Sequence, residues 1–414
     1  MKKNIFYAQS GGVTPVINAT ASGIINSYLK NKKYFGKFFA GKNGIIGALN
    51  EELIDVEKEN INQIKLLKST PGGAFGSCRL KLKSPREFQR ILDVFKAHNI
   101  GYFFYNGGGD SQDTTNKLNE YCKSQNYSLV CIGLPKTIDN DLSVTDNCPG
   151  FGSVAKYIAV STYEASLDVQ SMCQSSTKVF LLEVMGRHAG WLAASSGVLK
   201  SNKKDAPHII LFPEKTFVQE SFLKKVKNTV NENGYCVIVA SEGIKNSKNQ
   251  FISDSGGKDS FGHAQLGGVA PILASLINKS LKYKVHWSVA DYLQRAARHV
   301  ASKIDVQQAY TLGMEAIKYA KIKKSGIMLT IDSKKSKKYS WSIGYTDLKN
   351  VANKEKRLPK KYISNDGYAI TQSCRQYISN LINGEDYPKY KNGLPLYSKL
   401  RKILIKKKLD KFEL

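Results

Sequence analysis

Two carboxylates and a lysine lie within residues 135–141, whose sequence is Pro-Lys-Thr-Ile-Asp-Asn-Asp. Asp139 and Asp141 could accept a proton and order a metal ion, and Lys136 could neutralise the charge of phosphate oxygens. This combination suits phosphoryl transfer, which depends on positioning and charge neutralisation more than on covalent chemistry. A turn rich in Asp and Asn that caps a helix would have the same composition. The stretch alone therefore supports both interpretations.

The residues just before this stretch indicate where it lies in the fold. Residues 129–134 form an apolar run that ends at Pro135, which predicts a buried β-strand. The charged cluster would then follow the carboxyl end of a strand. Open α/β sheets bind their ligands at that edge.

Glycine-containing turns follow three other predicted strands, at residues 10–12, 107–111 and 185–187. The backbone N–H groups of such a turn can approach an anion closely, and a following helix adds its positive end. Residues 71–74, followed by Arg79, form a fourth candidate. Glycine turns are also common as plain connections, but their occurrence together with the charged cluster favours a cleft that binds phosphate.

Strands and helices alternate over the first three quarters of the chain. Strands are predicted at residues 4–8, 102–105, 129–134, 179–184, 208–212 and 235–240. Helices are predicted at residues 16–29, 113–124 and 151–169, with a short apolar helix after residue 190 and an amphipathic helix between residues 212 and 235. This order predicts parallel sheets covered by helices on both faces.

The last quarter of the chain differs in composition. Residues 302–322 predict a helix and residues 327–331 a strand, whereas the segment after Lys334 is basic, Tyr-rich and rich in turns. We therefore expect an α/β protein in which residues 1–300 form two lobes with the active site between them. Residues 301–414 are expected to complete the second lobe and wrap over it.

Length and composition limit the possible classes of protein. The 414 residues are 42% hydrophobic, enough for two cores. No apolar run approaches the ~20 residues of a membrane span, and the short apolar run near the N-terminus is not typical of a signal peptide. The seven Cys form no metal-binding spacing, which favours free thiols in a reducing compartment. We expect a soluble cytoplasmic protein with no membrane partner.

The formal net charge is +28, and residues 279–414 hold 30 Lys and Arg against 11 Asp and Glu. Such a charge could indicate a surface for nucleic acid or acidic lipid. Lys greatly outnumbers Arg, however, and no familiar nucleic-acid-binding motif is present. We interpret the charge as solvated lysine and as attraction for a polyanionic small substrate, and we do not expect nucleic acid to be a partner.

Seven short motifs together resemble the phosphofructokinase family. They occur in the family's order, at residues 10–12, 72–79, 107–111, 135–141, 185–187, 241–243 and 261–263. The tail, with residues 351–356 and 393–397, resembles the bacterial branch that uses pyrophosphate. The resemblance implies two α/β lobes with mostly parallel sheets flanked by helices, plus a C-terminal extension. It also implies reversible phosphoryl transfer from pyrophosphate to the 1-hydroxyl of fructose 6-phosphate in glycolysis and gluconeogenesis, with Mg²⁺ as cofactor.

Two residues distinguish the phosphoryl donor within this family. Members that use ATP have glycine at the positions of Asp110 and Lys136. A carboxylate at position 110 would lie where the α-phosphate of ATP should be, and like charges ~4 Å apart repel by about 4 kcal/mol at an effective dielectric of 20. Lys136 would enter the space left by the missing nucleoside and balance the charge of pyrophosphate. The pair is therefore expected to reject ATP and favour pyrophosphate.

The resemblance implies a role for each matching residue. Asp139 would be the general base for the 1-hydroxyl, and Lys136 would stabilise the transferring phosphoryl group. Asp110 is implied as a catalytic residue and as the Mg²⁺ ligand, since Gly109 stands where many members have a metal-binding aspartate. The remaining implied contacts are Gly12, Arg79, Gly108 and Lys136 to pyrophosphate, and Thr137, Ile138, Asp139, Asp141, Met185, Gly186, Arg187 and Glu242 to the sugar or the Mg²⁺ shell.

The cation that binds the sugar phosphate differs from that of the ATP-using members. Those have an Arg three positions after His263, where this chain has Leu266. Tyr292 and Arg295 resemble a Tyr-x-x-Arg element of the pyrophosphate branch that serves instead; without the resemblance they would be an ordinary pair on one helix face. Lys178 matches a basic position that reaches a neighbouring subunit's sugar phosphate, which implies a homodimer or homotetramer.

Two alternatives remain open at this point. An ATP-dependent 6-phosphofructokinase is disfavoured by Asp110 and Lys136. A non-catalytic regulatory subunit of the same fold should have lost its acidic residues, yet Asp110, Asp139 and Asp141 are present. His188, beside a glycine turn, is interpreted as a structural residue.

Overall fold

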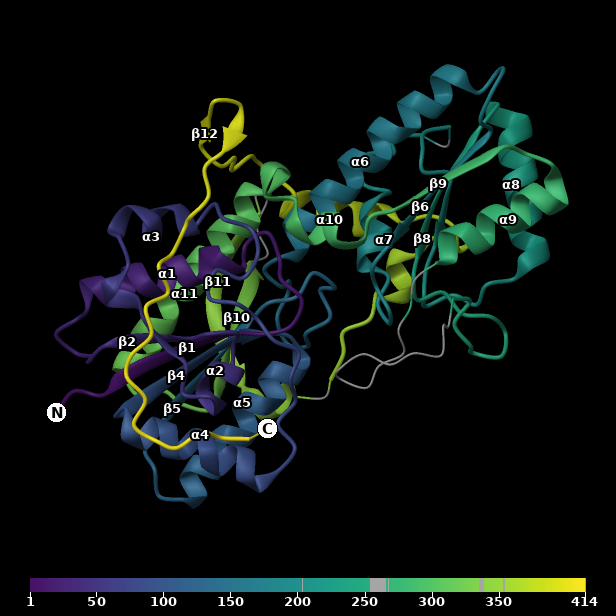
Figure 1. Cartoon of the computed structure of the whole chain (residues 1–414). Helices are drawn as coiled ribbons and strands as arrows, with labels where there is room; N and C mark the ends of the chain where they lie inside the picture. The colour runs from purple at the N-terminus through teal and green to yellow at the C-terminus, as the bar shows by residue number, and fades with distance from the viewer. Residues whose placement is uncertain (203, 254–265, 267, 335–338, 353, 414) are drawn as a thin grey trace.

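The structure is a computed structural model that describes residues 1–202, 204–253, 266, 268–334, 339–352 and 354–413. The chain folds into two α/β lobes, which confirms the predicted fold class (Figure 1). The first, larger lobe contains a seven-stranded sheet and the second a four-stranded sheet. Among the helices of the described residues, none has both the length and the apolar character needed to cross a membrane.

The sheet of the larger lobe is mostly parallel. Its strands lie in the order β11 (Ser340–Asp347), β10 (Ile327–Lys334), β5 (Val130–Pro135), β4 (Ile100–Gly107), β1 (Asn4–Gln9), β2 (Phe38–Gly41) and β3 (Leu53–Asp55). Only β11 and β3 run antiparallel to their neighbours. Gln9 pairs with Asn106, and Asn106 pairs with Leu134. The carboxyl ends of β1, β4 and β5 therefore lie side by side.

Alternate residues of the central strands face two different cores. On β1, Ile5 and Tyr7 pack against one layer of helices, whereas Phe6 and Ala8 pack against the other, and all four are fully buried. The first layer contains α1 (Ile17–Lys30), α3 (Ile61–Leu67) and α11 (Lys303–Lys321); the second contains α2 (Ile46–Leu49), α4 (Pro85–Ala97) and α5 (Gly109–Ser124). This double burial explains the nearly continuous apolar runs of these strands.

Helices α1 and α11 cross where each has a glycine. A Cβ on Gly23 would lie 2.1 Å from the carbonyl oxygen of Tyr310, and one on Gly313 would lie 2.1 Å from that of Thr20. Any side chain at these positions would push the two backbones apart. The two glycines therefore allow α11 to pack closely against α1.

The smaller lobe contains a fully parallel sheet. Its strands lie in the order β7 (Ile209–Leu211), β8 (Cys236–Ser241), β6 (Val179–Val184) and β9 (Val285–Val289). Helices α8 (Gln219–Asn233) and α9 (Val269–Leu281) cover one face; α6 (Phe151–Met172), α7 (Trp191–Ser195) and α12 (Gln372–Leu381) cover the other. A short helix, α10 (Asp291–Ala296), follows β9.

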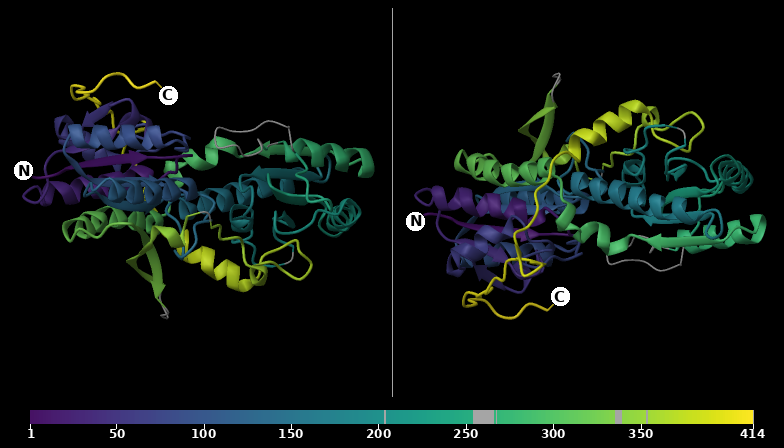
Figure 2. Two further views of the ribbon diagram at one scale, coloured as in Figure 1. Left: turned by 90° about the horizontal axis from the view of Figure 1, so that it is seen from below. Right: turned by 90° about the horizontal axis from the view of Figure 1, so that it is seen from above.

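Residues 301–414 do not simply complete the second lobe, as the sequence led us to expect. Helix α11 and strands β10 and β11 belong to the larger lobe, and α12 belongs to the smaller one. After a small hairpin of β12 (Tyr390–Lys391) and β13 (Leu394–Pro395), the chain runs back over the larger lobe (Figure 2). There Ile403 and Ile405 exchange backbone hydrogen bonds of 2.9 Å with the two ends of β3. The expectation holds for α12 but was wrong for α11, β10 and β11, because residue patterns do not specify which sheet a strand enters.

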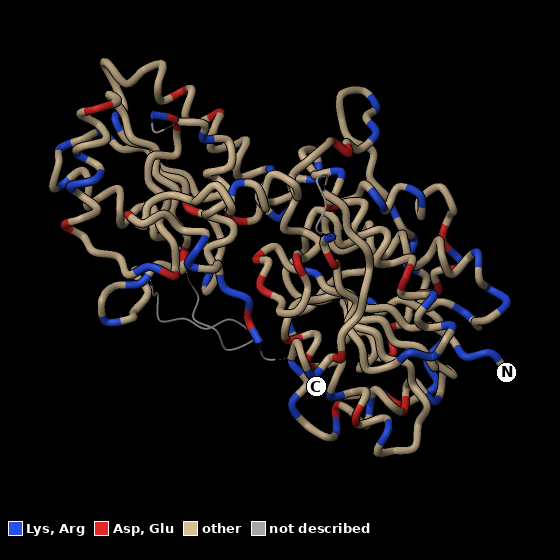
Figure 3. The backbone as a smooth tube through the Cα atoms, turned by 180° about the vertical axis from the view of Figure 1, so that it is seen from behind, with Lys and Arg blue, Asp and Glu red and all other residues tan. Residues whose placement is uncertain are grey.

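Charged side chains are distributed over both lobes. Figure 3 shows Lys and Arg interspersed with Asp and Glu along the described chain. Single turns of 3₁₀ helix complete the structure, at Val56–Lys58, Arg298–Val300, Leu348–Asn350 and Lys360–Tyr362.

Candidate active site

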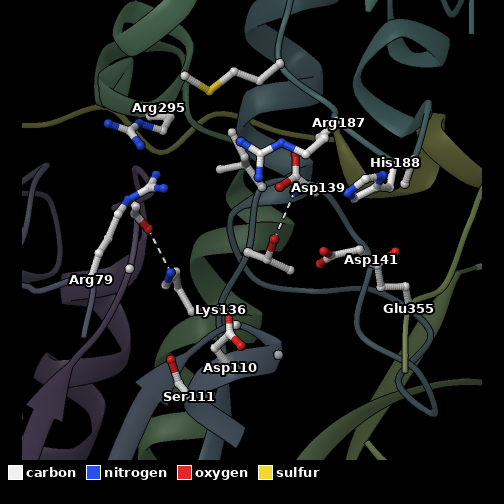
Figure 4. Close-up of a pocket in the computed structure, with 18 of the residues that line it drawn as sticks. Arg79, Asp110, Ser111, Lys136, Asp139, Asp141, Arg187, His188, Arg295 and Glu355 are labelled. Atoms are coloured by element: carbon white, nitrogen blue, oxygen red, sulfur yellow. Dashed lines mark hydrogen bonds between the residues drawn. The ribbon is translucent and has the colours of Figure 1, made fainter. Parts of the chain in front are cut away.

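A cavity of 310 Å³ lies between the lobes, where β1, β4 and β5 end on one side and β6 and β8 on the other. Most of the residues singled out from the sequence line it (Figure 4). They are Gly12, Arg79, Gly108, Asp110, Lys136, Thr137, Ile138, Asp139, Asp141, Met185, Arg187, Glu242 and Arg295. The structure thus brings together residues that are up to 283 positions apart, the separation of Gly12 and Arg295.

The loop after β5 presents two carboxylates to this cavity. Asp139 donates its backbone N–H to Oγ1 of Thr137 over 3.1 Å, which closes a tight turn. Between the two carboxylates, Asn140 adopts a left-handed conformation with φ of 53°, which Asn tolerates better than most residues. The buried Asn140 side chain accepts from the backbone of Cys148 (3.0 Å) and donates to the hydroxyl of Tyr377 (2.8 Å). The loop after β5 does not cap a helix. The helix-capping turn that the composition also allowed is therefore not what these residues form, and they are available for a site.

Lys136 lies over the first glycine turn. Its Nζ donates to the carbonyl oxygen of Gly12 over 2.7 Å, and its side chain is almost completely buried. A Cβ on Gly12 would lie 2.6 Å from Nη1 of Arg295 and 3.5 Å from Nη2 of Arg79. Three cations therefore surround one glycine. This arrangement can bind a compact anion of high charge.

Asp110 lies in the first turn of α5, which begins four residues earlier than the predicted helix start at Asp113. Gly108 is the N-cap, so the positive end of a 16-residue helix faces the cavity. The carboxylate of Asp110 forms an ion pair with Nζ of Lys81 at 3.1 Å. Sequence analysis did not single out Lys81, because nothing in the residue pattern pairs it with α5.

The smaller lobe forms the opposite wall. Gly186, with φ of 131°, lies between Met185 and Arg187 and donates its N–H to Oε1 of Glu242 over 3.2 Å. A Cβ on Gly243 would lie 2.0 Å from the carbonyl oxygen of Arg187, so the turns that follow β6 and β8 can pack together only with glycine at that position. This wall presents a guanidinium and a carboxylate to the same cavity as the two aspartates.

Burial shifts the pKa values of the central residues. The pKa of Asp139 is raised to about 8, first by loss of hydration and then by the charges of Asp141 and Glu242. The pKa of Lys136 is lowered to about 8, mainly by burial, although the charge of Asp141 opposes the shift. Burial also raises the pKa of Asp141 and of Glu242. A carboxylate with a pKa near neutrality is suited to general-base catalysis.

The C-terminal segment contributes a wall that sequence analysis did not predict. Glu355 lines the cavity, and its neighbour Lys356 fixes the loop that holds the aspartates. The Lys356 backbone N–H donates to the carbonyl of Asp141 (2.6 Å), and its buried Nζ donates to the carbonyls of Thr145 and Asp146 (3.0 Å each). The sequence indicated this segment only as part of the tail's resemblance to the pyrophosphate branch.

Replacing Lys356 with methionine is expected to lower the free energy of unfolding by about 1–3 kcal/mol, because the carbonyl of the buried Thr145 would lose its donor. Chemical denaturation measures this change. Lys354→Met is the matched control, since Lys354 is exposed two positions away on the same segment and should have little effect. Equal stability of the two variants would mean that Lys356 does not hold the loop.

Three predicted residues, Gly186, Tyr292 and Lys178, do not line the cavity within this chain. Tyr292 is 65% exposed and packs on the guanidinium of Arg295, 4.1 Å from its ring centre. Lys178 donates to the carbonyls of Cys173 and Gln174 just beyond the end of α6. His263 lies outside the described residues. His188, which was interpreted as structural, lines the cavity, as do Val13, Ser111 and Glu355.

Comparison with known proteins agrees with this geometry. A profile of the phosphofructokinase family matches residues 4–320. The chain is 52% identical to the pyrophosphate–fructose 6-phosphate 1-phosphotransferase of Halomonas elongata, with 99% of each chain covered. It is 54% identical to a pyrophosphate-dependent phosphofructokinase of Marinobacter aquaeolei whose crystal structure superposes with a TM-score of 0.92 over all of both chains. The chain therefore belongs to the phosphofructokinase family.

Proposed function

We propose that this protein transfers a phosphoryl group from pyrophosphate to the 1-hydroxyl of fructose 6-phosphate, giving fructose 1,6-bisphosphate and phosphate. The reaction is reversible and serves glycolysis and gluconeogenesis. Relatives that are 51–52% identical over nearly the whole chain bear the name of this activity. The observation that carries the proposal is the buried Lys136 amine, bonded to Gly12 and facing the cavity beside Asp110.

The loop after β5 would perform the proton transfer. Asp139 would accept the proton of the 1-hydroxyl while that oxygen forms its bond to phosphorus and the bond to the bridging oxygen of pyrophosphate breaks. Thr137, Ile138 and Asp141 would orient the sugar. Met185, Gly186, Arg187 and Glu242 would hold the sugar from the opposite wall, and Arg295 is the cation proposed for its phosphate.

The glycine turn and its cations would bind pyrophosphate. Lys136 and Arg79 would neutralise the charge that builds up on the transferring and leaving groups, and the N–H groups of Gly12 and Gly108 would add fixed dipoles. Arg295 lies against the same turn, so we propose that it contacts pyrophosphate as well as the sugar phosphate. The site would act mainly through positioning and charge.

We propose Mg²⁺ as the cofactor. Mg²⁺ is usually held by one or two carboxylates together with substrate phosphates and water. The described part of the chain contains no group of three side chains that could hold a metal by themselves, which fits an ion that enters with pyrophosphate. Asp110 would be the protein ligand, in exchange for its ion pair with Lys81. When bound, the ion would neutralise part of the charge of pyrophosphate.

The donor assay tests the proposal directly. Purified protein with fructose 6-phosphate and Mg²⁺ should form fructose 1,6-bisphosphate with pyrophosphate and not with ATP. Turnover with ATP alone would make the protein an ATP-dependent 6-phosphofructokinase. Lack of turnover with either donor would indicate a regulatory subunit of the same fold.

The pH profile of kcat/KM should be bell-shaped with a maximum near pH 8. Asp139 must be ionised to accept a proton, and its pKa is about 8, so activity should rise with pH up to that value. Lys136 must be charged, and its pKa is also about 8, so activity should fall above it. Lys136→Arg should abolish the alkaline limb, because arginine stays charged. A profile that is flat from pH 6 to 9 would contradict both assignments.

We further propose a homodimer or homotetramer. On the smaller lobe, Trp287 is 48% exposed, Tyr292 65% and Leu293 67%, beside the edge strand β9. Exposed apolar side chains gathered in this way often form an interface. The amine of Lys178 lies away from the cavity of its own chain, which supports a role in a neighbouring subunit's site.

Leu293→Glu is expected to dissociate this oligomer, because a carboxylate would be buried at the interface without a partner. Sedimentation velocity measures the change in mass. Leu394→Glu is the matched control, since Leu394 is 71% exposed on the β12–β13 hairpin. A monomeric native protein, or an oligomer unaffected by Leu293→Glu, would contradict this interface.

We place the protein in the cytoplasm. All seven cysteines are unpaired and buried, which suits a reducing compartment. The assigned substrates are metabolites of the cell interior.

A further inference from the structure

A second cavity, of 250 Å³, lies in the smaller lobe where β6, β7 and β8 end. Arg187 and His188 line both this cavity and the candidate active site, so the two cavities share one wall. The segments that follow β7 and β8 form the other sides, and Arg357 of the C-terminal segment closes the lining. The carboxyl ends of parallel strands are the usual place for ligands in sheets of this kind.

The lining is strongly basic. Besides Arg187, it includes Lys215, Lys245 and Arg357, which come from three different segments. None of these last three takes part in an ion pair between described residues. Cations gathered in a concave site repel one another and attract anions.

The carboxylate in this lining is already engaged with the backbone. Oε1 of Glu214 accepts hydrogen bonds from the N–H groups of Gly190 (2.9 Å) and Leu358 (3.0 Å). These bonds tie the segment after β7 to α7 and to the C-terminal segment. Glu214 offsets the charge of Arg357. Asp139 and Glu242 offset that of Arg187. Lys215 and Lys245 then leave the cavity with a net positive charge.

Part of the basic lining is held by an aromatic ring. Nζ of Lys245 lies 4.6 Å from the centre of the Phe251 ring, and the imidazole of His188 lies 6.1 Å from it. A cation held over a ring is partly ordered before any ligand binds. Ordering of this kind lowers the entropic cost of binding an anion.

We propose that this second cavity binds a small phosphorylated anion, either inorganic phosphate or a phosphate ester, in addition to the substrates of the catalysed reaction. Lysine and arginine from several segments, around a cavity of this size, can surround a dianionic phosphate group. The proposal depends on the charge and shape of the cavity and not on the reaction assigned above. Because the two cavities share Arg187 and His188, an anion bound here would lie next to the active site.

Equilibrium dialysis tests this proposal with two radiolabelled probes, inorganic phosphate and glycerol 3-phosphate, at constant ionic strength. The full-length chain would bear Lys136→Met, which removes a phosphate-binding cation from the active site. We expect saturable binding by this variant. Adding Lys245→Ala and Arg357→Ala should weaken binding of the probe at least tenfold, and the probe that binds more tightly identifies the source of the anion.

Lys248→Ala is the matched control, since Lys248 lies on the same loop as Lys245 but is exposed and outside the lining. It should leave binding unchanged. If the protein with Lys245→Ala and Arg357→Ala fails to fold, a second variant is used. Lys215→Ala with Lys245→Ala leaves the C-terminal segment intact and should weaken binding similarly. Absence of saturable binding in the Lys136→Met protein, or binding that survives these substitutions, would overturn the proposal.

Discussion

Replacing Asp139 with alanine is expected to lower kcat about 10²–10⁴-fold, the contribution typical of a general base. The KM values for both substrates should change little, because the phosphate groups are assigned to Lys136, Arg79 and Arg295. The turn itself is held by backbone and by Thr137 and should survive without the carboxylate. Steady-state kinetics with pyrophosphate, and calorimetry of fructose 6-phosphate binding, separate the two effects.

Two further variants make the Asp139 result specific. Asp139→Asn keeps the shape of the side chain and should be nearly as slow as the alanine variant. Asp347→Ala removes an exposed carboxylate of β11, distant from the cavity lining, and should leave kcat unchanged. Near-normal turnover by Asp139→Ala would move the base to another carboxylate of the cavity, Asp141 or Glu242.

Much of the fold and site could be predicted because the information is local. The strands at residues 4–8 and 179–184 match β1 and β6 within one residue, since strands buried on both faces are uninterrupted apolar runs. Pro135 ends the apolar run, which predicts that the charged stretch at residues 135–141 lies at the end of a strand, as β5 shows. Parallel order then brings the glycine turns to the same edge of the sheet.

The features that were missed depend on contacts between distant parts of the chain. Glu355 reaches the cavity through backbone pairing with Leu142, more than 200 residues earlier. Lys81 meets Asp110 because the loop before α4 lies beside the start of α5, which no local pattern indicates. Strand β10 enters the sheet beside β5 through backbone hydrogen bonds that any residue could make. Residue type therefore specified the elements but not these neighbours.

The double substitution of Asp110→Gly with Lys136→Gly is expected to give the protein measurable turnover with ATP. Removing Asp110 abolishes a repulsion of about 4 kcal/mol towards a phosphate ~4 Å away. Removing the Lys136 side chain frees the space that a nucleoside needs, because in the unsubstituted protein the Lys136 amine lies against the carbonyl of Gly12. Turnover with pyrophosphate should fall about 30-fold or more, because the variant lacks the buried Lys136 cation that would pair with pyrophosphate. The same coupled assay, run with each donor, measures both changes.

Both changes are needed because Asp110 and Lys136 oppose ATP in different ways, and the ion pair between Lys81 and Asp110 affects the first of them. Lys81 neutralises part of the Asp110 charge, so the carboxylate acts on ATP through its volume as well as through repulsion. Asp110→Gly alone leaves the Lys136 side chain in the nucleoside space, and Lys136→Gly alone leaves the carboxylate, so each single variant should gain far less ATP turnover than the pair. Lys81→Met tests the charge separately: with Asp110 unpaired, discrimination against ATP should become stronger. A double variant that folds, binds fructose 6-phosphate and shows no ATP turnover would mean that donor choice is determined elsewhere in the cavity.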